Sequence, residues 1–527
     1  MSETQPLLNE TDTKVLRGHK RHLGHLENYF ALLQRQELYG NFSISCKLNH
    51  GITYADLVRG LRSVVLANPI MMHTMVSATK KGLSWDKLSK YYRSAEYLDK
   101  PWPEHDYMEV VDHLSLKDVV LNEQTDTYGD LLLQLQEQFQ SDNGVITENL
   151  SNILSRIRIP VYQRNQPNWR ILCLNSNYMD NNDDSFDTLV FISNHCCADA
   201  MTGINLFQDI VSAINKNGTV KEEDSVQSSL EIWNYERDYS ECGKLPIPIT
   251  DRVNYVPSIL GFIWLIISTI VNGIFNYKSI CEKTERIEES KPQLCYQTFV
   301  RFTPDEIIKI KKQINKEKCT MTALMQTALC ITLKEHGIFN NCRRHEITFD
   351  ITVPNNTRKA LPESLAQEQY KYGANVGGLH YSYLISSFQD SQFWSLARYY
   401  NGVFKTGDYL SGLGSLMLSF VTQNKNMDAM IADEYLNKKR GGIILSNVGV
   451  INTSTGSEDN SSTLQIEDML FMQNLGVLNF SYSVNIVTTT LGGMNLCMSA
   501  VEGAVASQEE FTAFGNELRA KIMDKCD

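Results

Sequence analysis

The sequence feature that most constrains the fold is a long uncharged segment in the middle of the chain. Val253 to Tyr277 contains no Asp, Glu, Lys or Arg over 25 consecutive positions. Such a length could span a hydrocarbon layer of about 30 Å. A single spanning helix here would place residues 1–252 and 278–527 on opposite sides of a membrane, and the two parts could not share a site. The choice of fold therefore depends on whether this segment spans.

The residues of this segment divide between two faces of a helix. Small and polar residues fall near one face, and they are Gly261, Ser268, Thr269, Asn272 and Asn276. Aliphatic residues cover the opposite face, and they are Leu260, Ile263, Ile267, Ile270, Val271 and Ile274. A striped helix of this kind lies in a membrane interface or packs on protein. We expect membrane contact without spanning, with burial in the protein and a true span as the alternatives.

Charge and cysteine content exclude several classes of protein. The net charge of -12 over 527 residues disfavours a nucleic-acid partner. The 12 cysteines are scattered, and the chain opens on a largely polar stretch, Ser2 to Lys14, with no visible secretory signal. We therefore expect free thiols in a reducing compartment. The absence of a CxxC pair argues against a zinc site, so no metal is expected.

A histidine stands at a predicted strand-to-helix turn. The β-forming run Thr188 to Ser193 follows a polar, turn-rich stretch, and Ala198 to Ile214 has apolar residues at helical spacing. His195 lies between them. A histidine at the end of a strand can act as a general base near neutral pH, and an ordinary buried histidine is the alternative interpretation. Asp199 is expected to cap backbone amides or pair with an arginine, which is a structural role.

The remaining pattern predicts an α/β chain. Helices are expected at Thr53 to Ala67, after Thr303, and at Thr320 to Lys334, with a terminal amphipathic helix at Glu509 to Met523. The terminal helix could dock on the core or contact a membrane. Strands are expected at Glu346 to Val353, Gly378 to Ile385, Gly441 to Leu445, Asn479 to Thr490 and Met494 to Val501.

Several motifs carry a family resemblance. The stretch from Asn194 to Gly203, which reads NHCCADAMTG, resembles the active-site signature of the chloramphenicol acetyltransferase, BAHD and condensation-domain superfamily. His22 to Phe42 resembles the start of the yeast alcohol acetyltransferases. The stretches Thr352 to Arg358, Tyr372 to Gly378 and Ile444 to Gly449 resemble later elements in the same order. The Asp-Phe-Gly-Trp-Gly element of the plant enzymes is absent, and the region of Ser446 is its nearest counterpart.

The resemblance implies a fold and a set of site residues. Two similar mixed-sheet α/β halves of chloramphenicol-acetyltransferase-like fold would meet along an interdomain tunnel. Residues 1–240 would form the N-terminal half, 241–292 the crossover with the uncharged segment, and 293–527 the C-terminal half. His195 would be the catalytic base, and Arg358 would pair with Asp199. The supporting residues expected on the same grounds are Gly203, within the signature, and Asn375, Ser446 and Asn447, as candidates to steady an oxyanion.

The resemblance also implies an activity. We expect transfer of an acetyl group from acetyl-CoA, as co-substrate with no tightly bound cofactor, to an apolar alcohol such as a fusel alcohol or a sterol. The expected protein is a monomer on the cytosolic face of the endoplasmic reticulum or on lipid droplets. One alternative is an N-acetyltransferase acting on long-chain or sphingoid amines. The other is a non-catalytic membrane-bound binding protein of the same fold.

Overall fold

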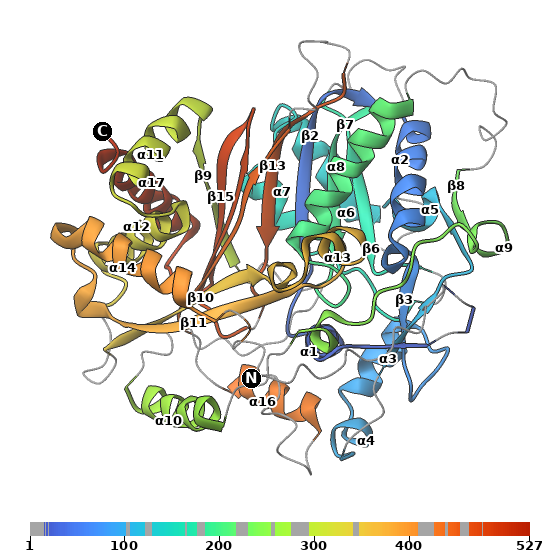
Figure 1. Cartoon of the computed structure of the whole chain (residues 1–527), viewed down its shortest axis with the longest axis horizontal. Coiled ribbons are helices and arrows are strands. Elements are labelled where there is room, and N and C mark those ends of the chain that lie inside the picture. Colours follow the sequence, from blue (N-terminus) through green and yellow to red (C-terminus); the bar gives the residue numbers. More distant parts are fainter. Residues whose placement is uncertain are drawn as a thin grey trace.

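The computed structural model describes most of the chain. The described residues are 15, 17–18, 20–101, 106–121, 129–163, 166–176, 185–217, 230–253, 259–275, 295–340, 347–408, 410, 426–437, 441–453, 463–476 and 478–527. Two main sheets stand side by side, with helices on their outer faces (Figure 1).

The first main sheet has four antiparallel strands in the order β13-β2-β7-β6. Their bounds are Ile466–Gln473, Phe42–Ile52, Phe186–Ser193 and Trp169–Leu174. One face packs on α2 (Tyr54–Ala67) and α8 (Ala200–Asn217), and the other on α6 (Gly129–Ser141) and α7 (Glu148–Leu154). Burial on both faces explains the continuous apolar run that ends at Ser193.

The second main sheet has six strands in the order β11-β10-β12-β14-β15-β9. Their bounds are Val376–Leu384, Thr348–Asn356, Ile443–Ile451, Tyr482–Thr489, Gly493–Val501 and Cys295–Phe302. The helices over its outer face are α11 (Pro304–Lys316), α12 (Met321–Glu335), α14 (Phe393–Thr406) and α17 (Gln508–Asp524). Four of the five strands expected in this region are confirmed to within three residues, and β12 extends six residues beyond the expected end at Leu445.

Shorter elements complete the described chain. The strands are β1 (Arg21–His22), β3 (His73–Val76), β4 (Tyr107–Val110), β5 (His113–Ser115) and β8 (Glu231–Asn234). The helices are α1 (His25–Arg35), α3 (Trp85–Tyr92), α4 (Ala95–Leu98), α5 (Leu116–Val119), α9 (Tyr235–Asp238), α13 (Glu363–Glu368) and α16 (Met427–Asn437).

The C-terminal half contributes one strand to the sheet of the N-terminal half. β13 comes from the C-terminal part of the chain but pairs with β2 in the N-terminal sheet, from Ile466 opposite Leu48 to Gln473 opposite Phe42. The boundary expected at residue 293 therefore divides the chain in sequence, but the first main sheet contains strands from both sides of this boundary. Since hydrogen bonds join the parts before and after the uncharged segment, both parts lie on one side of any membrane.

Helix starts follow the expected capping chemistry. Thr53, Thr303 and Thr320 each accept a hydrogen bond from a backbone N–H in the first turn of α2, α11 and α12. The terminal helix α17 docks on the second sheet, since Phe511, Phe514, Leu518 and Ile522 are all buried there. Core docking is thus the correct alternative for its apolar stripe.

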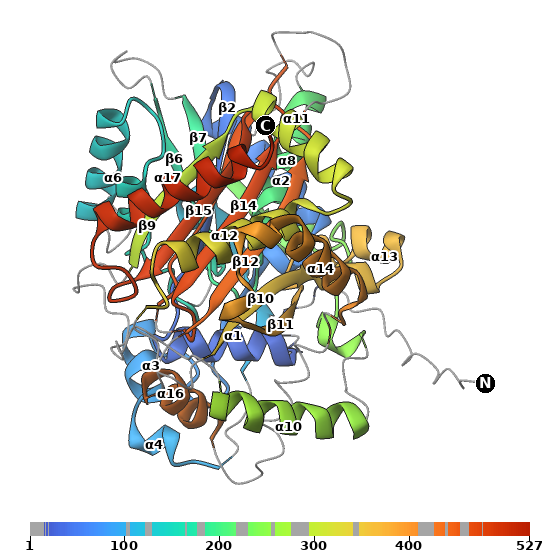
Figure 2. The same ribbon diagram turned by 90° about the vertical axis from the view of Figure 1, so that its left-hand side faces the viewer.

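Helix α10 (Ile259–Phe275) is formed by the central part of the uncharged segment, and it lies at the base of the molecule near α16, away from the two main sheets (Figure 2). Within the described residues, none of the helices combines the length and apolar character needed to cross a bilayer. Eight aliphatic side chains of α10 are nevertheless exposed, and they are Ile259, Leu260, Ile263, Ile266, Ile267, Ile270, Val271 and Ile274.

Candidate active site

His195 lies in the turn between β7 and α8, as the sequence predicts. The side chain is buried, with 9% of its surface exposed, and Nδ1 lies 3.1 Å from the backbone oxygen of Ala198. A carbonyl oxygen only accepts hydrogen bonds, so Nδ1 carries the ring proton and donates it. Nε2 is then the unprotonated nitrogen, with a lone pair available to take a proton.

Three aromatic rings surround the imidazole of His195. Phe42 stacks on it with ring centroids 4.4 Å apart, Tyr39 lies parallel at 5.7 Å, and Phe30 is tilted at 4.8 Å. The three rings come from α1, the loop after it and the start of β2. This stretch is the one whose sequence resembles the start of the yeast enzymes, but the pattern alone gave no site role to these rings.

Burial makes the imidazole of His195 resist protonation. It lowers the pKa of His195 to about 4, although the hydrogen bond to Ala198 and the negative charge of Asp199 act in the opposite direction. The ring is therefore neutral at physiological pH.

Asp199 is held by donors from both halves. The guanidinium of Arg358 donates two hydrogen bonds to it, at 2.7 and 3.2 Å, and the backbone N–H groups of Thr202 and Asn375 donate at 2.9 and 3.1 Å. Burial raises the pKa of Asp199, but the charge of Arg358 and these hydrogen bonds outweigh it, so the net pKa is below the ordinary value. The expected pair with Arg358 is formed, and Asp199 caps α8.

A loop of the C-terminal half is fastened to α8. Thr202 Oγ1 donates to the carbonyl oxygen of Gly373, and Lys371 Nζ lies 2.7 Å from Asp209 of the same helix. The side-chain amide of Asn375 donates to two carbonyl oxygens of its own loop, at 3.1 and 3.0 Å. The described contacts of Asn375 therefore shape this loop and leave its amide N–H groups occupied.

Gly203 allows α8 to approach the sheet closely. A Cβ atom at this position would lie 2.7 Å from the side chain of Ile44 and 2.8 Å from that of Phe191. Neither neighbour is the far end of a flexible chain, so a side chain here would push the helix and its turn outward. Gly203 thus fixes the depth of the turn that carries His195.

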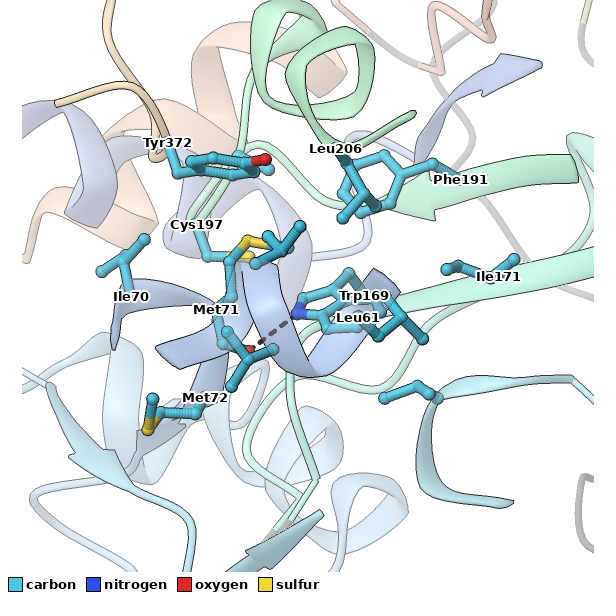
Figure 3. Close-up of a cluster of buried hydrophobic side chains, with 14 of the residues drawn as sticks. Leu61, Ile70, Met71, Met72, Trp169, Ile171, Phe191, Cys197, Leu206 and Tyr372 are labelled. Carbon is cyan, nitrogen blue, oxygen red and sulfur yellow. Dashed lines mark hydrogen bonds between the residues drawn. The ribbon is translucent and has the colours of Figure 1, made fainter. Parts of the chain in front are cut away.

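The apolar cluster behind the turn is well packed. Cys197 lies among Met71, Leu206 and Tyr372, and the indole of Trp169 donates a hydrogen bond of 2.9 Å to the backbone oxygen of Met71 (Figure 3). The described cysteines are all free thiols. In the part of the chain that the structure describes, no group of three or more His, Cys, Asp or Glu residues is placed to hold a metal ion.

Ser446 and Asn447 point to opposite faces of β12. Asn447 donates a hydrogen bond of 3.1 Å to Thr322 on α12, which covers the outer face of the sheet. Ser446 is on the other face, where its register partner across β14 is Asn485. Asn485 is 1% exposed, and both polar atoms of its side chain lack a hydrogen-bond partner among the described residues.

Sequence reasoning did not single out Asn485. A polar residue at a fully buried position of a predicted strand was the available signal, since a buried amide without a partner is unfavourable and often marks function. Together, Ser446 and Asn485 place two polar side chains on the face of the sheet that is turned toward the N-terminal half.

A small cleft beside Phe42 lies between the two halves. The described residues that line it are Asn41, Phe42, Ser43, Ser151, Leu154, Ser155, Ile192, Gln297, Met472, Gln473 and Asn474. Most of these residues carry amides or hydroxyls, and none of those described is charged. Because Phe42 also stacks on His195, the cleft lies next to the wall of the histidine site.

Sequence comparison assigns the chain to a family. A model described as alcohol acetyltransferase matches residues 22–522. The chain is 34% identical to alcohol O-acetyltransferase 2 of Saccharomyces cerevisiae, over 96% of this chain and 95% of that protein. It is 31% identical to alcohol O-acetyltransferase 1 of the same yeast, over 97% and 96%.

Solved structures show the same fold at low sequence identity. A trichothecene 15-O-acetyltransferase from Fusarium sporotrichioides matches with a TM-score of 0.59 at 12% identity, covering 100% of both chains. The condensation domain of a monacolin K polyketide synthase matches with a TM-score of 0.53 at 10% identity, over 96% of this chain and 97% of that chain. The chloramphenicol-acetyltransferase-like fold predicted from the motifs is confirmed.

Proposed function

Because the chain belongs to the alcohol acetyltransferase family, and is thus an acyltransferase, we propose that it transfers an acetyl group from acetyl-CoA to an apolar alcohol with His195 as general base. The observation that carries this proposal is the fixed tautomer of His195. With Nδ1 donating to Ala198, only Nε2 can accept the proton of an incoming hydroxyl.

The proposed reaction proceeds without a covalent acyl-enzyme. Nε2 of His195 removes the hydroxyl proton while the alcohol oxygen attacks the thioester carbonyl carbon. The tetrahedral intermediate then collapses, the carbon–sulfur bond breaks, and the proton passes to the departing thiolate. The products are an acetate ester and free coenzyme A.

The oxyanion of that intermediate needs donors placed in advance. Of the three candidates from the sequence, Asn375 and Asn447 use their amides in other hydrogen bonds, with loop carbonyls and Thr322 respectively. Ser446 and its unpartnered neighbour Asn485 are the better choice in this proposal.

The acetyl donor is a co-substrate in this proposal, and no tightly bound cofactor takes part.

The acceptor is a fusel alcohol or a sterol delivered from a lipid surface, and α10 supports this part of the proposal. Its exposed aliphatic stripe would lie in the interface without crossing it. The free thiols agree with a reducing compartment, so we place a monomeric protein on the cytosolic face of the endoplasmic reticulum or on lipid droplets.

The test of the chemistry is ester formation from acetyl-CoA in detergent, with isoamyl alcohol, decanol, a 3-hydroxysterol and a long-chain amine as acceptors. We expect esters from the wild-type protein and a loss of about a hundredfold to ten-thousandfold in His195→Ala. Acetylation of the amine alone would favour an N-acetyltransferase. No product with any acceptor would favour a binding protein.

The test of the membrane proposal is flotation with phosphatidylcholine vesicles. Changing Ile263, Ile267 and Ile270 to Asn should weaken binding by more than about tenfold for each residue, because each loses about 1.5–3 kcal/mol of apolar burial. The control is Ile308→Asn, which alters an isoleucine of α11 that is 65% exposed. Equal binding by the triple variant and the control would disprove the role of α10.

A further inference from the structure

The rings around His195 have a geometry that the proposed proton transfer does not itself require. Phe42 and Tyr39 both lie nearly parallel to the imidazole, at interplanar angles of 21° and 16°, and Phe30 covers it at 32°. We name these three residues the aromatic collar. The collar lies against the faces of a ring whose only described hydrogen bond is to a backbone carbonyl, and 9% of the residue's surface remains exposed.

The collar is held from behind, so it cannot open easily. Phe42 is 1% exposed and packs edge to face with Phe191 and Phe471, each with ring centroids 6.2 Å away. Tyr39 is 2% exposed, and its hydroxyl accepts a hydrogen bond from the amide of Gln473 on β13. Two strands of the first sheet therefore fix two of the three rings.

A base that activates an alcohol can also activate water. In that side reaction the water oxygen would attack the thioester carbonyl carbon, the carbon–sulfur bond would break, and His195 would pass the water proton to the thiolate. The products would be acetate and free coenzyme A. Each such event consumes the donor without forming an ester.

The collar opposes this side reaction because a bound water needs two to four polar partners, and ring faces offer none. An apolar alcohol replaces those missing contacts with its own carbon chain, which packs favourably on aromatic surfaces. The aromatic collar thus disfavours water and favours an apolar alcohol as the acceptor.

We propose that Phe30, Tyr39 and Phe42 are specificity-determining residues that keep water away from His195 and so suppress hydrolysis of the acetyl donor. The inference rests on the proposed function, because it takes His195 as the base. A collar that served only to fill the core would change stability when altered but would leave the ratio of hydrolysis to ester formation unchanged.

The matched pair of variants is Phe42→Leu and Phe186→Leu. Both remove one buried ring from the same apolar cluster, but Phe42 stacks on His195, whereas the described ring contact of Phe186 is with Tyr54. The measurement is the release of free coenzyme A without alcohol, divided by ester formation with decanol. Phe42→Leu should raise this ratio by about tenfold to two-hundredfold, the range in which one apolar wall changes discrimination. Phe186→Leu should leave it near the wild-type value.

A pH profile of the same variants gives a second readout. Opening the collar in Phe42→Leu lets water solvate the imidazolium, so the acid limb of ester formation should move up toward pH 6.5, the ordinary pKa of histidine. Asp199 stays ionised beside Arg358 in both variants and does not account for such a shift. If Phe42→Leu fails to fold, Phe30→Leu on α1 replaces it, with the same expected ratio and shift.

Two results would overturn the inference. One is an unchanged ratio in a folded Phe42→Leu or Phe30→Leu variant, and the other is an equal rise in Phe186→Leu. Failure of the proposed function itself is distinguishable, because the wild-type protein would then form no ester at all.

Discussion

His195 and Asp199 stand four residues apart in the same buried turn, but their surroundings are opposite in kind. Asp199 accepts hydrogen bonds from Arg358, Thr202 and Asn375. His195 has one described hydrogen bond, to a backbone oxygen, and otherwise meets the faces of aromatic rings. Both carboxylate oxygens of Asp199 accept hydrogen bonds within the folded protein, whereas Nε2 of His195 has a lone pair without a described hydrogen bond.

The contrast assigns a structural role to Asp199 and a chemical role to His195. Two of the donors to Asp199 belong to the C-terminal half, so the carboxylate joins the halves at the point where the turn ends and α8 begins. A residue saturated in this way has no capacity left for a substrate. The residue that is left incompletely satisfied is the one that can gain a new hydrogen bond in the transition state.

The largest expected effect comes from removing the base without disturbing the turn. His195→Gln keeps most of the side-chain volume but has no nitrogen that can act as a base. Ester formation should fall by about a hundredfold to ten-thousandfold, while the free energy of unfolding should change less than for Asp199→Asn. Acetyl-transfer assays and urea unfolding measure the two quantities. Wild-type activity in this variant would contradict the division of roles.

The next effect is on stability. Asp199→Asn leaves the buried guanidinium of Arg358 without its charge partner, which should lower the free energy of unfolding by about 3–5 kcal/mol. The matched control is Asp209→Asn on the same helix, where the pair with Lys371 is partly exposed and should contribute about 1 kcal/mol or less. Similar urea midpoints for the two variants would show that Asp199 is not a structural anchor.

Asn485 provides a third case, since its buried amide is unsatisfied in the way that His195 is. Asn485→Ala should lower the turnover number by about a hundredfold to a thousandfold if the amide steadies the oxyanion. The same change should leave stability equal or higher, because it removes an unpaired polar group.

The control for Asn485 is Asn495→Ala on the neighbouring strand β15. The amide of Asn495 donates to Asp468 and to the backbone of Met469, so its loss should lower stability and affect turnover less. A fall in stability with an unchanged turnover number in Asn485→Ala would show that Asn485, like Asp199, has a structural role.

The sequence was most informative where structure depends on neighbours along the chain. A threonine cap located the helix after Thr303, apolar spacing located the helix at Thr53, and alternating strand and helix patterns located His195 at its turn. The pairing of Arg358 with Asp199 also followed, but from resemblance to relatives and not from any local pattern.

The parts that could not be predicted depend on contacts between distant segments. The position of β13 in the N-terminal sheet depends on strand pairing between segments more than 400 residues apart, such as Phe42 and Gln473. A local sequence pattern does not predict such a pairing. The placement of Asn485 beside Ser446 follows from the register of β12 and β14. The aromatic collar forms only when α1, β2 and the turn after β7 pack together.

The smallest effect is expected in the wild-type protein, as a pH dependence that should be nearly flat above pH 5. Because burial lowers the pKa of His195 to about 4, the base is unprotonated throughout that range, and activity should fall only as the pH drops toward 4. An acid limb at pH 6.5 would mean that the imidazole is solvated and the collar is open.

The lowered pKa of His195 also makes the free energy of unfolding depend on pH. Between pH 6.5 and 4 the unfolded chain binds a proton at His195 that the folded chain refuses, so stability should also decline as the pH falls through this window. The low pKa of Asp199 acts in the same direction but at lower pH, since its contribution is lost only as the pH falls through and below about 3.9, the ordinary value for an aspartate. Urea unfolding at pH 7, 5, 4 and 3 therefore separates the two residues, because the contribution of His195 is lost between pH 6.5 and 4 and that of Asp199 only below about pH 3.9.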